Sequence, residues 1–212
     1  MIEPGKAAVV IIDMQNGFLN ERSSLCIAGA QATIPACARV LQAARKAGMT
    51  IVHAVRSYAD DGSNVEPCRY DTWMRGRPLS QVCESAIGTA EPAELAPALE
   101  DLIVVKPSFS AFFGTDLHEI LRERGIGTVV LLGTTTPNCI RSSCYDALSL
   151  GYNVAVIEDA TSSRTQAVQE SNIADMAFIG AYVLSSDEFS KSLLADMDDV
   201  AERVRRSIDA NR

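Results

Sequence analysis

The chain has 212 residues, of which 47% are hydrophobic and 22% charged, and its formal net charge is −8. A chain of this length can bury a large core without a disulfide or a metal to hold it together. Its Arg and Lys residues form no basic stripe and no apolar stretch reaches the length of a membrane span, so we expect neither nucleic-acid nor membrane binding. No signal-type segment follows Met1. We therefore expect one domain over residues 1–212, a cytoplasmic location and reduced cysteines.

The chain opens on a buried strand. Residues 7–12 are all apolar, as in a parallel strand covered on both faces, and Asp13 follows directly. An acid in this place is either a turn or helix-capping residue, or a group at the edge of an α/β sheet where ligands bind. A helical period then covers residues 29–48, and residues 50–55 predict the second strand.

Residues 56–91 form a long segment rich in Gly, Pro, Asp and Ser, and they contain the only tryptophan, Trp73. Long segments without regular structure are uncommon in compact domains unless they have a function. We expect this one to cover either an active-site crevice or a subunit interface.

A third buried strand is predicted over residues 102–105, and Lys106 ends it. A lysine at the end of an apolar strand is costly to bury unless it is paired. An aromatic loop over 107–115 and a helix over 116–124 follow. The three phenylalanines of this loop are expected in the core rather than as a platform for substrate: Phe109, Phe112 and Phe113.

The central stretch predicts a strand over 128–132, a break at Gly133 and Pro137, and a helix from Asn138. Cys139 would then lie in the first turn of that helix. Free backbone N–H groups and the helix dipole favour a thiolate there and can hold an oxyanion. The alternative is a small core cysteine.

The rest of the chain continues the alternation of strands and helices. The expected elements are a strand over 153–157, a helix over 166–180, a strand over 181–184 and a terminal helix from 186. This alternation predicts an α/β fold with three layers, α/β/α, and a mainly parallel, doubly wound (Rossmann-like) sheet of about six strands.

Parallel strands point their carboxyl ends the same way, so Asp13, Lys106 and Cys139 should meet at one edge of the sheet. A thiol needs a base to take its proton, a carboxylate can serve, and an ammonium stabilises the negative charge that they share. The residues therefore predict Cys139 as the nucleophile, Asp13 as the proton acceptor and later donor, and Lys106 as their electrostatic partner.

These stretches resemble the isochorismatase-like cysteine hydrolases. The resemblance is carried by the strand that ends in Asp13 with Gln15 after it, by Lys106 ahead of Ser110-Ala-Phe-Phe-Gly-Thr115, and by Gly133-Thr-Thr-Thr-Pro-Asn-Cys139. It implies that the Asp, the Lys and the Cys form a catalytic triad, and that the bond between Thr134 and Thr135 is a non-proline cis peptide. It also implies an oxyanion hole made by the backbone N–H groups of Thr135 and Cys139.

The resemblance further implies an activity. Members with the cysteine hydrolyse a C–N bond of a small amide or ureido compound through a thioester and release ammonia, whereas members that act on isochorismate lack it. The nicotinamidase branch binds a metal through an Asp and several His near the second strand, but in that region this chain offers only His53. We therefore expect no metal and no cofactor, and a homo-oligomer, a dimer or a tetramer.

Arg164 bears on the substrate. The resemblance is closest to the N-carbamoylsarcosine/maleamate amidohydrolase branch, in which an Arg at this place binds the substrate carboxylate. This favours a carboxylate-bearing amide or N-carbamoyl substrate, while a surface salt bridge is the alternative role for the residue. A second reading keeps the triad but takes an uncharged urea-, biuret- or nicotinamide-like amide. A nucleotide-binding or scaffold domain is disfavoured, because no strand is followed by GxGxxG or a P-loop.

Overall fold

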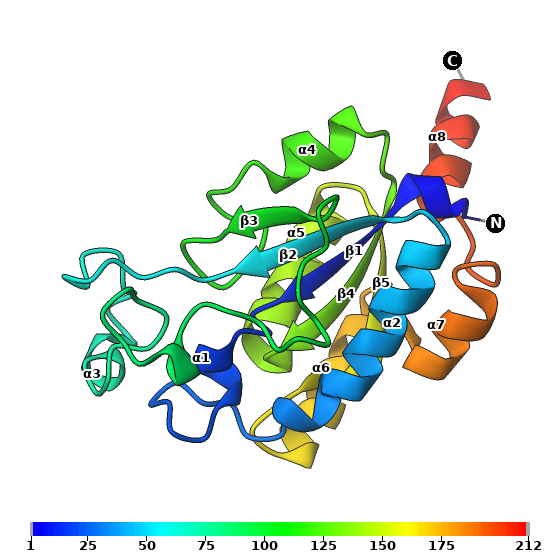
Figure 1. Ribbon diagram of the computed structural model, residues 1–212. Helices are drawn as coiled ribbons and strands as arrows, with labels where there is room; N and C mark the ends of the chain where they lie inside the picture. The colour runs from blue at the N-terminus through cyan, green and yellow to red at the C-terminus, as the bar shows by residue number, and fades with distance from the viewer. Residues whose placement is uncertain (1, 211–212) are drawn as a thin grey trace.

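The computed structural model describes residues 2–210, and its centre is a parallel sheet of six strands in the order β3-β2-β1-β4-β5-β6 (Figure 1). The strands are β1 (Ala7–Ile12), β2 (Thr50–Val55), β3 (Leu102–Val105), β4 (Thr128–Thr134), β5 (Asn153–Ser162) and β6 (Tyr182–Leu184). The chain runs outward from β1 to β3 on one side and from β4 to β6 on the other. This confirms the predicted doubly wound sheet and places its switch point between β1 and β4.

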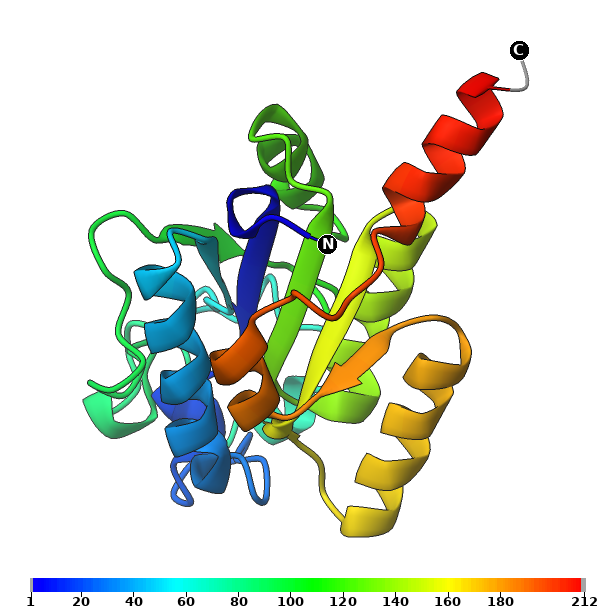
Figure 2. The ribbon, with the colours of Figure 1, turned by 90° about the vertical axis from the view of Figure 1, so that its right-hand side faces the viewer.

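Helices cover both faces of the sheet (Figure 2). One face packs against α2 (Ile34–Lys46) and α7 (Ser186–Ser192), and the other against α4 (Leu117–Glu123), α5 (Arg141–Ser149) and α6 (Gln166–Phe178). Every residue of β1 is buried, with Val9 and Ile11 in the first core and Val10 and Ile12 in the second. The continuous apolar run of this strand is explained by its two covered faces.

The remaining helices complete the described chain, and α8 projects from the body towards the C-terminus (Figure 2). They are η1 (Pro4–Lys6), α1 (Asn16–Leu19), η2 (Gln31–Thr33), α3 (Tyr70–Trp73), η3 (Ser85–Ile87), η4 (Thr136–Ile140) and α8 (Val200–Ala210). The single terminal helix predicted from residue 186 is wrong. The chain leaves α7 at Leu193, whose φ of 51° is left-handed and cannot continue a right-handed helix. No helix within residues 2–210 has the length and apolar character needed to cross a membrane.

Two strands extend further than the sequence predicts. β4 continues through Gly133, where the pairing with β5 shifts register, and β5 continues to Ser162. Glu158 and Asp159 have exposed side chains within β5, so their charges interrupt the apolar run without ending the strand.

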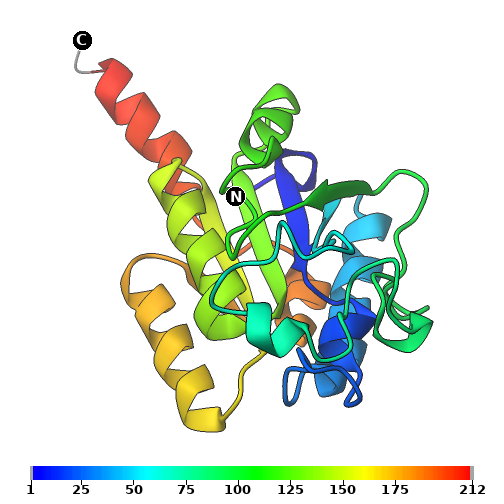
Figure 3. The same cartoon turned by 90° about the vertical axis from the view of Figure 1, so that its left-hand side faces the viewer.

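The segment 56–91 lies beyond the carboxyl ends of β1 and β2, beside α1 (Figures 1 and 3). It has a small hydrophobic cluster of its own, which also takes in residues that follow β1: Phe18, Leu25, Tyr58, Val65, Trp73 and Leu79. Its tryptophan is fully buried and donates a hydrogen bond from Nε1 to the carbonyl of Pro78 at 2.9 Å. The segment is therefore a packed cover over this edge of the sheet.

Candidate active site

The side chains of Asp13, Lys106 and Cys139 meet at the carboxyl edge of the sheet. The ammonium Nζ of Lys106 lies 2.7 Å from Oδ2 of Asp13 and 3.6 Å from Sγ of Cys139. Nζ also donates a hydrogen bond of 3.1 Å to the carbonyl of Ser108. All three side chains are buried, so their mutual charges are weakly screened by water.

The strands fix Asp13 and Lys106 at neighbouring positions. The backbone N–H of Asp13 bonds to the carbonyl of Ala54 at 3.0 Å, and that of Lys106 to the carbonyl of Val55 at 2.9 Å. Asp13 has a φ of 54°, so the chain turns sharply as it leaves β1. The two residues thus continue the hydrogen bonding of adjacent strands, and this directs both side chains to one place.

Gln15 joins this edge to the two ends of the segment 56–91. Its side-chain Nε2 donates to the carbonyls of Arg56 and Thr89, both at 2.8 Å, and its Oε1 accepts from the backbone N–H of Arg56 at 2.7 Å. One buried amide therefore fastens the start and the end of the cover beside Asp13.

Cys139 lies in a wider turn than the sequence predicts. The turn η4 is π-helical, and the N–H of Ile140 bonds to the carbonyl of Thr135, five residues back, at 3.3 Å. Regular α-helix begins only at Arg141. The Thr135 carbonyl also accepts from the N–H of Asn138, three residues on, at 3.1 Å.

The pKa of the Cys139 thiol is raised. Burial raises this pKa most and the charge of Asp13 raises it further, while Lys106 and Arg69 lower it. A helix N-terminus alone would favour the thiolate, but here the loss of water around the sulfur dominates. The free site thus holds a thiol beside a carboxylate that can take its proton.

The threonines before the cysteine are anchored to the end of β5. The hydroxyl of Thr134 lies 2.9 Å from that of Ser162, and the hydroxyls of Thr135 and Thr136 donate to the Ser162 carbonyl at 2.9 and 3.0 Å. The peptide bond between Thr134 and Thr135 is cis. These side chains are therefore occupied in holding the turn, which leaves backbone groups as the parts of it that can meet a ligand.

The aromatic loop after β3 divides between core and surface. Phe112 is buried in the core, as predicted, whereas Phe113 is exposed and the core prediction is wrong for it. Gly114 has a φ of 65° and turns the chain directly after it. Phe109 is partly buried and lies beneath two guanidinium groups, those of Arg56 at 5.9 Å and Arg69 at 5.1 Å from its ring centre.

Sequence reasoning missed both of these arginines. Arg56 follows β2 directly and is 1% exposed. Its Nη1 lies 2.6 Å from Oε1 of Glu66 and donates to the Pro107 carbonyl at 3.0 Å. The rule that selected Asp13, a charge directly after an apolar strand, would also have found Arg56. Arg69 lies within the segment 56–91, where no periodic pattern marks it.

Arg164 makes no hydrogen bond or ion pair with these groups in the part of the chain that the structure describes. It follows β5 with an exposed side chain, and it lines a hollow together with Gly29 and Thr33. Within residues 2–210 its guanidinium makes no hydrogen bond or ion pair. Its predicted role with a substrate carboxylate stays a prediction.

His53 is buried in β2 and has partners of its own. Its Nδ1 lies 2.7 Å from Oε2 of Glu91, and its Nε2 lies 3.3 Å from Oδ2 of Asp101. The described residues include no group of three or more His, Cys, Asp or Glu side chains that could hold a metal ion. The six cysteines are free thiols.

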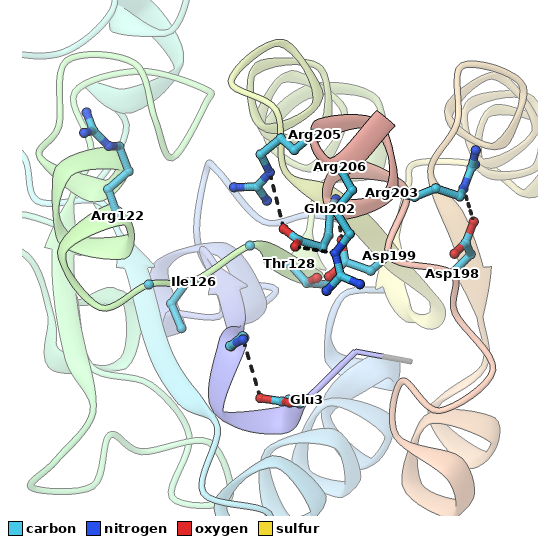
Figure 4. A pocket seen from close by; sticks show the side chains of 13 residues that line it. Glu3, Arg122, Ile126, Thr128, Asp198, Asp199, Glu202, Arg203, Arg205 and Arg206 are labelled. Atoms are coloured by element: carbon cyan, nitrogen blue, oxygen red, sulfur yellow. Dashed lines mark hydrogen bonds and ion pairs between the residues drawn. The ribbon is translucent and has the colours of Figure 1, made fainter. Parts of the chain in front are cut away.

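A charged hollow lies at the opposite end of the sheet, next to Thr128 at the start of β4 (Figure 4). Its acids and bases largely pair with one another, as Glu202 does with Arg205 and Arg206.

Comparison with known proteins identifies the family. The model of the isochorismatase domain matches residues 7–188, which include the whole sheet and all three clustered side chains. The chain belongs to the isochorismatase family of hydrolases. A probable inactive nicotinamidase of Arabidopsis thaliana is 36% identical over 192 residues, covering 88% of this chain and 95% of that protein. The ureidoacrylate amidohydrolase RutB of Rhizobium rhizogenes is 35% identical over 176 residues, covering 76% and 72%.

Solved structures of isochorismatase-like proteins share the fold. An isochorismatase family protein from Desulfovibrio vulgaris superposes with a TM-score of 0.82 at 39% identity, covering 90% of this chain and 98% of that one. The N-carbamoylsarcosine amidase from Thermoplasma acidophilum superposes with a TM-score of 0.72 at 30% identity, covering 86% and 98%.

Proposed function

We propose that this isochorismatase-family chain is a cysteine-dependent amidohydrolase. It cleaves a C–N bond of a small carboxylate-bearing amide or N-carbamoyl compound through a thioester and releases ammonia. The observation that carries the proposal is the position of the Lys106 ammonium, in contact with both the Asp13 carboxylate and the Cys139 sulfur. A nucleophile, a base and a cation at one buried point are the parts that amide hydrolysis needs.

In the first half-reaction, Asp13 takes the proton of the Cys139 thiol as the sulfur attacks the carbonyl carbon. The negative charge passes to the carbonyl oxygen, which the backbone N–H groups of Thr135 and Cys139 hold in the tetrahedral adduct. Protonated Asp13 then gives its proton to the leaving nitrogen, the C–N bond breaks, and ammonia and a thioester are formed. Lys106 offsets the negative charge that the sulfur and the carboxylate share throughout.

In the second half-reaction, Asp13 takes a proton from water, which attacks the thioester. The C–S bond breaks, the sulfur recovers its proton from Asp13, and the acid is released. An N-carbamoyl substrate yields a carbamic acid and ammonia by the same steps. Water is the only co-reactant.

The substrate class is supported by two of the relatives. RutB is named for ureidoacrylate and the Thermoplasma enzyme for N-carbamoylsarcosine. Each of these compounds carries both a carbamoyl group and a carboxylate. The Arabidopsis relative is named after nicotinamide, an uncharged amide, and is described as probably inactive. An uncharged amide is the second candidate, and we propose a dimer or a tetramer in either case.

The test is ammonia release from N-carbamoyl amino acids, maleamate, ureas and nicotinamide by the wild type and Cys139→Ser. We expect activity on the carboxylate-bearing compounds and a loss of at least about a thousandfold in the variant, because oxygen cannot replace the sulfur nucleophile without further activation. Cys68→Ala is the control, since that cysteine is exposed. Full activity of Cys139→Ser would refute the mechanism, and activity on nicotinamide or urea alone would favour the second candidate.

A further inference from the structure

One positive charge beside the reactive sulfur has no carboxylate of its own. Asp13 pairs with Lys106, and Glu66 lies 2.6 Å from Nη1 of Arg56. Glu66 reaches Arg69 only at Nε, across 3.9 Å. Each of the two close pairs has a net charge of zero. Among these five side chains, the guanidinium of Arg69 is therefore the one positive charge without a close carboxylate.

Aromatic rings fix the position of Arg69. Its guanidinium carbon lies 5.8 Å from the ring centre of Phe18 and 5.1 Å from that of Phe109. Phe18 belongs to α1, just after Asp13, and Phe109 to the loop just after Lys106. The arginine is therefore held between α1, which follows Asp13, and the loop that follows Lys106, and its charge is close enough to lower the pKa of the Cys139 thiol.

The hydrogen-bonding end of Arg69 is free. Within residues 2–210 its guanidinium donates no hydrogen bond, and 15% of the side chain is exposed. Glu66 is meanwhile held by Arg56, and by the Tyr58 hydroxyl, which donates to it at 2.8 Å. A guanidinium that is held against two rings and makes no hydrogen bond keeps its two terminal nitrogens available as a fork, the geometry that matches a carboxylate.

We infer that Arg69 binds the anionic group of the substrate while Cys139 attacks its amide carbonyl. This rests on the proposed function and deepens it, because it assigns selectivity for acids to the segment 56–91 rather than to Arg164. The substrate it fits is a short molecule with a carboxylate at one end and an amide or carbamoyl group at the other. Arg56 acts as a positioning residue that keeps Glu66 from neutralising Arg69.

The experiment compares alkylation of Cys139 by iodoacetate and by iodoacetamide, followed by mass spectrometry of the peptide that contains it. The two reagents have the same leaving group and differ in charge, so the ratio of their rate constants reports the charge near the sulfur. A change in the thiolate fraction affects both reagents equally and cancels. In Arg69→Gln we expect the ratio of iodoacetate to iodoacetamide to fall about tenfold, since one charge-assisted contact is lost.

Two further variants complete the test. Arg69→Lys keeps the charge and should keep most of the ratio, whereas Arg75→Gln removes an exposed charge from the same segment and should leave the ratio unchanged. A wild-type ratio in Arg69→Gln, or a fall in Arg164→Gln instead, would overturn the assignment even with Cys139 still reactive and the hydrolase intact. Failure of Cys139 to react with either reagent would overturn the proposed function together with the inference.

Discussion

At the scale of single residues, the site depends on opposed charges around one sulfur. The Asp13 carboxylate disfavours the thiolate of Cys139, and the cations of Lys106 and Arg69 favour it. A permanent thiolate would need no base, but a buried thiol does. In the proposed mechanism the raised pKa gives Asp13 its function, because the proton must leave the sulfur as the substrate is attacked.

Asp13→Asn tests this function, since it removes the charge with little change in size. We expect ammonia release to fall at least about a hundredfold because the base is lost. The pKa of Cys139 should fall at the same time, because the neighbouring negative charge no longer raises it. The thiolate is the reactive form and predominates above the pKa. The rise of the iodoacetamide rate constant with pH should therefore begin at a lower pH in the variant than in the wild type.

The measurement is the iodoacetamide rate constant of Cys139 against pH. In the wild type it should still be rising above pH 9.0, the ordinary pKa of a thiol, since the pKa here is raised from that value. Asp209→Asn on the exposed face of α8 is the control. A wild-type plateau well below that pH, or slower alkylation in Asp13→Asn, would contradict the assignment.

At the scale of elements, apolar runs in the sequence predict where most strands begin and end. They do not predict strand residues that are polar. The strands over 7–12, 50–55 and 102–105 match the structure at both ends, because each is a mostly apolar run that stops at a charged residue: Asp13, Arg56 or Lys106. The predicted burial is wrong for the strand over 102–105, whose residues Ile103 and Val105 are exposed at the edge of the sheet. β5 extends beyond the predicted end because Glu158 and Asp159 lie in the register shift between β4 and β5, and the pairing resumes at Thr161. Burial of side chains by distant segments is not visible in a local pattern.

The residues of the candidate site likewise divide into those that a local pattern predicts and those that depend on long-range packing. Asp13, Lys106 and Cys139 were predicted because each follows an apolar strand, and the topology then brings such residues together. Arg69 was missed because its place depends on how the segment 56–91 folds back over that edge. Long-range packing of this kind leaves no period in the sequence.

Gly133 shows how closely two elements approach at the site. It pairs with Ile12 across β1 and β4, has a φ of 107°, and a Cβ there would lie 2.2 Å from the Ile12 carbonyl oxygen. We expect Gly133→Ala to lower the free energy of unfolding by more than about 2 kcal/mol, since both the clash and the backbone strain oppose it. Asp13 follows Ile12 directly, so activity should fall as well.

Gly180→Ala is a matched control for this prediction. Gly180 has a φ of 110°, but nothing lies within 4 Å of its Cβ position, so only the strain applies. Denaturant unfolding of the two variants separates the terms. Equal destabilisation would mean that the backbone contact between β1 and β4 contributes nothing beyond the strain.

At the scale of the whole molecule, the candidate active site lies at the carboxyl ends of the strands, whereas the edge strand β3 is exposed to solvent. Among residues 2–210, β3 is an edge strand whose single partner is β2. Ile103 and Val105 share one of its faces and are 60% and 56% exposed, and Leu99 before them is exposed too. An apolar edge of this kind promotes pairing between chains unless it is covered.

This edge leads to a prediction about assembly. We expect light scattering to give a dimer or a tetramer of the 22.8 kDa chain. Ile103→Lys should lower the observed mass, because a charge replaces an apolar side chain where a second copy would cover it, and the fold should survive since the residue is mostly exposed. Leu150→Lys, at an exposed apolar residue after α5, should leave the mass unchanged. A monomeric wild type, or an Ile103→Lys variant of unchanged mass, would show that β3 remains open to solvent and that its apolar side chains serve no interface.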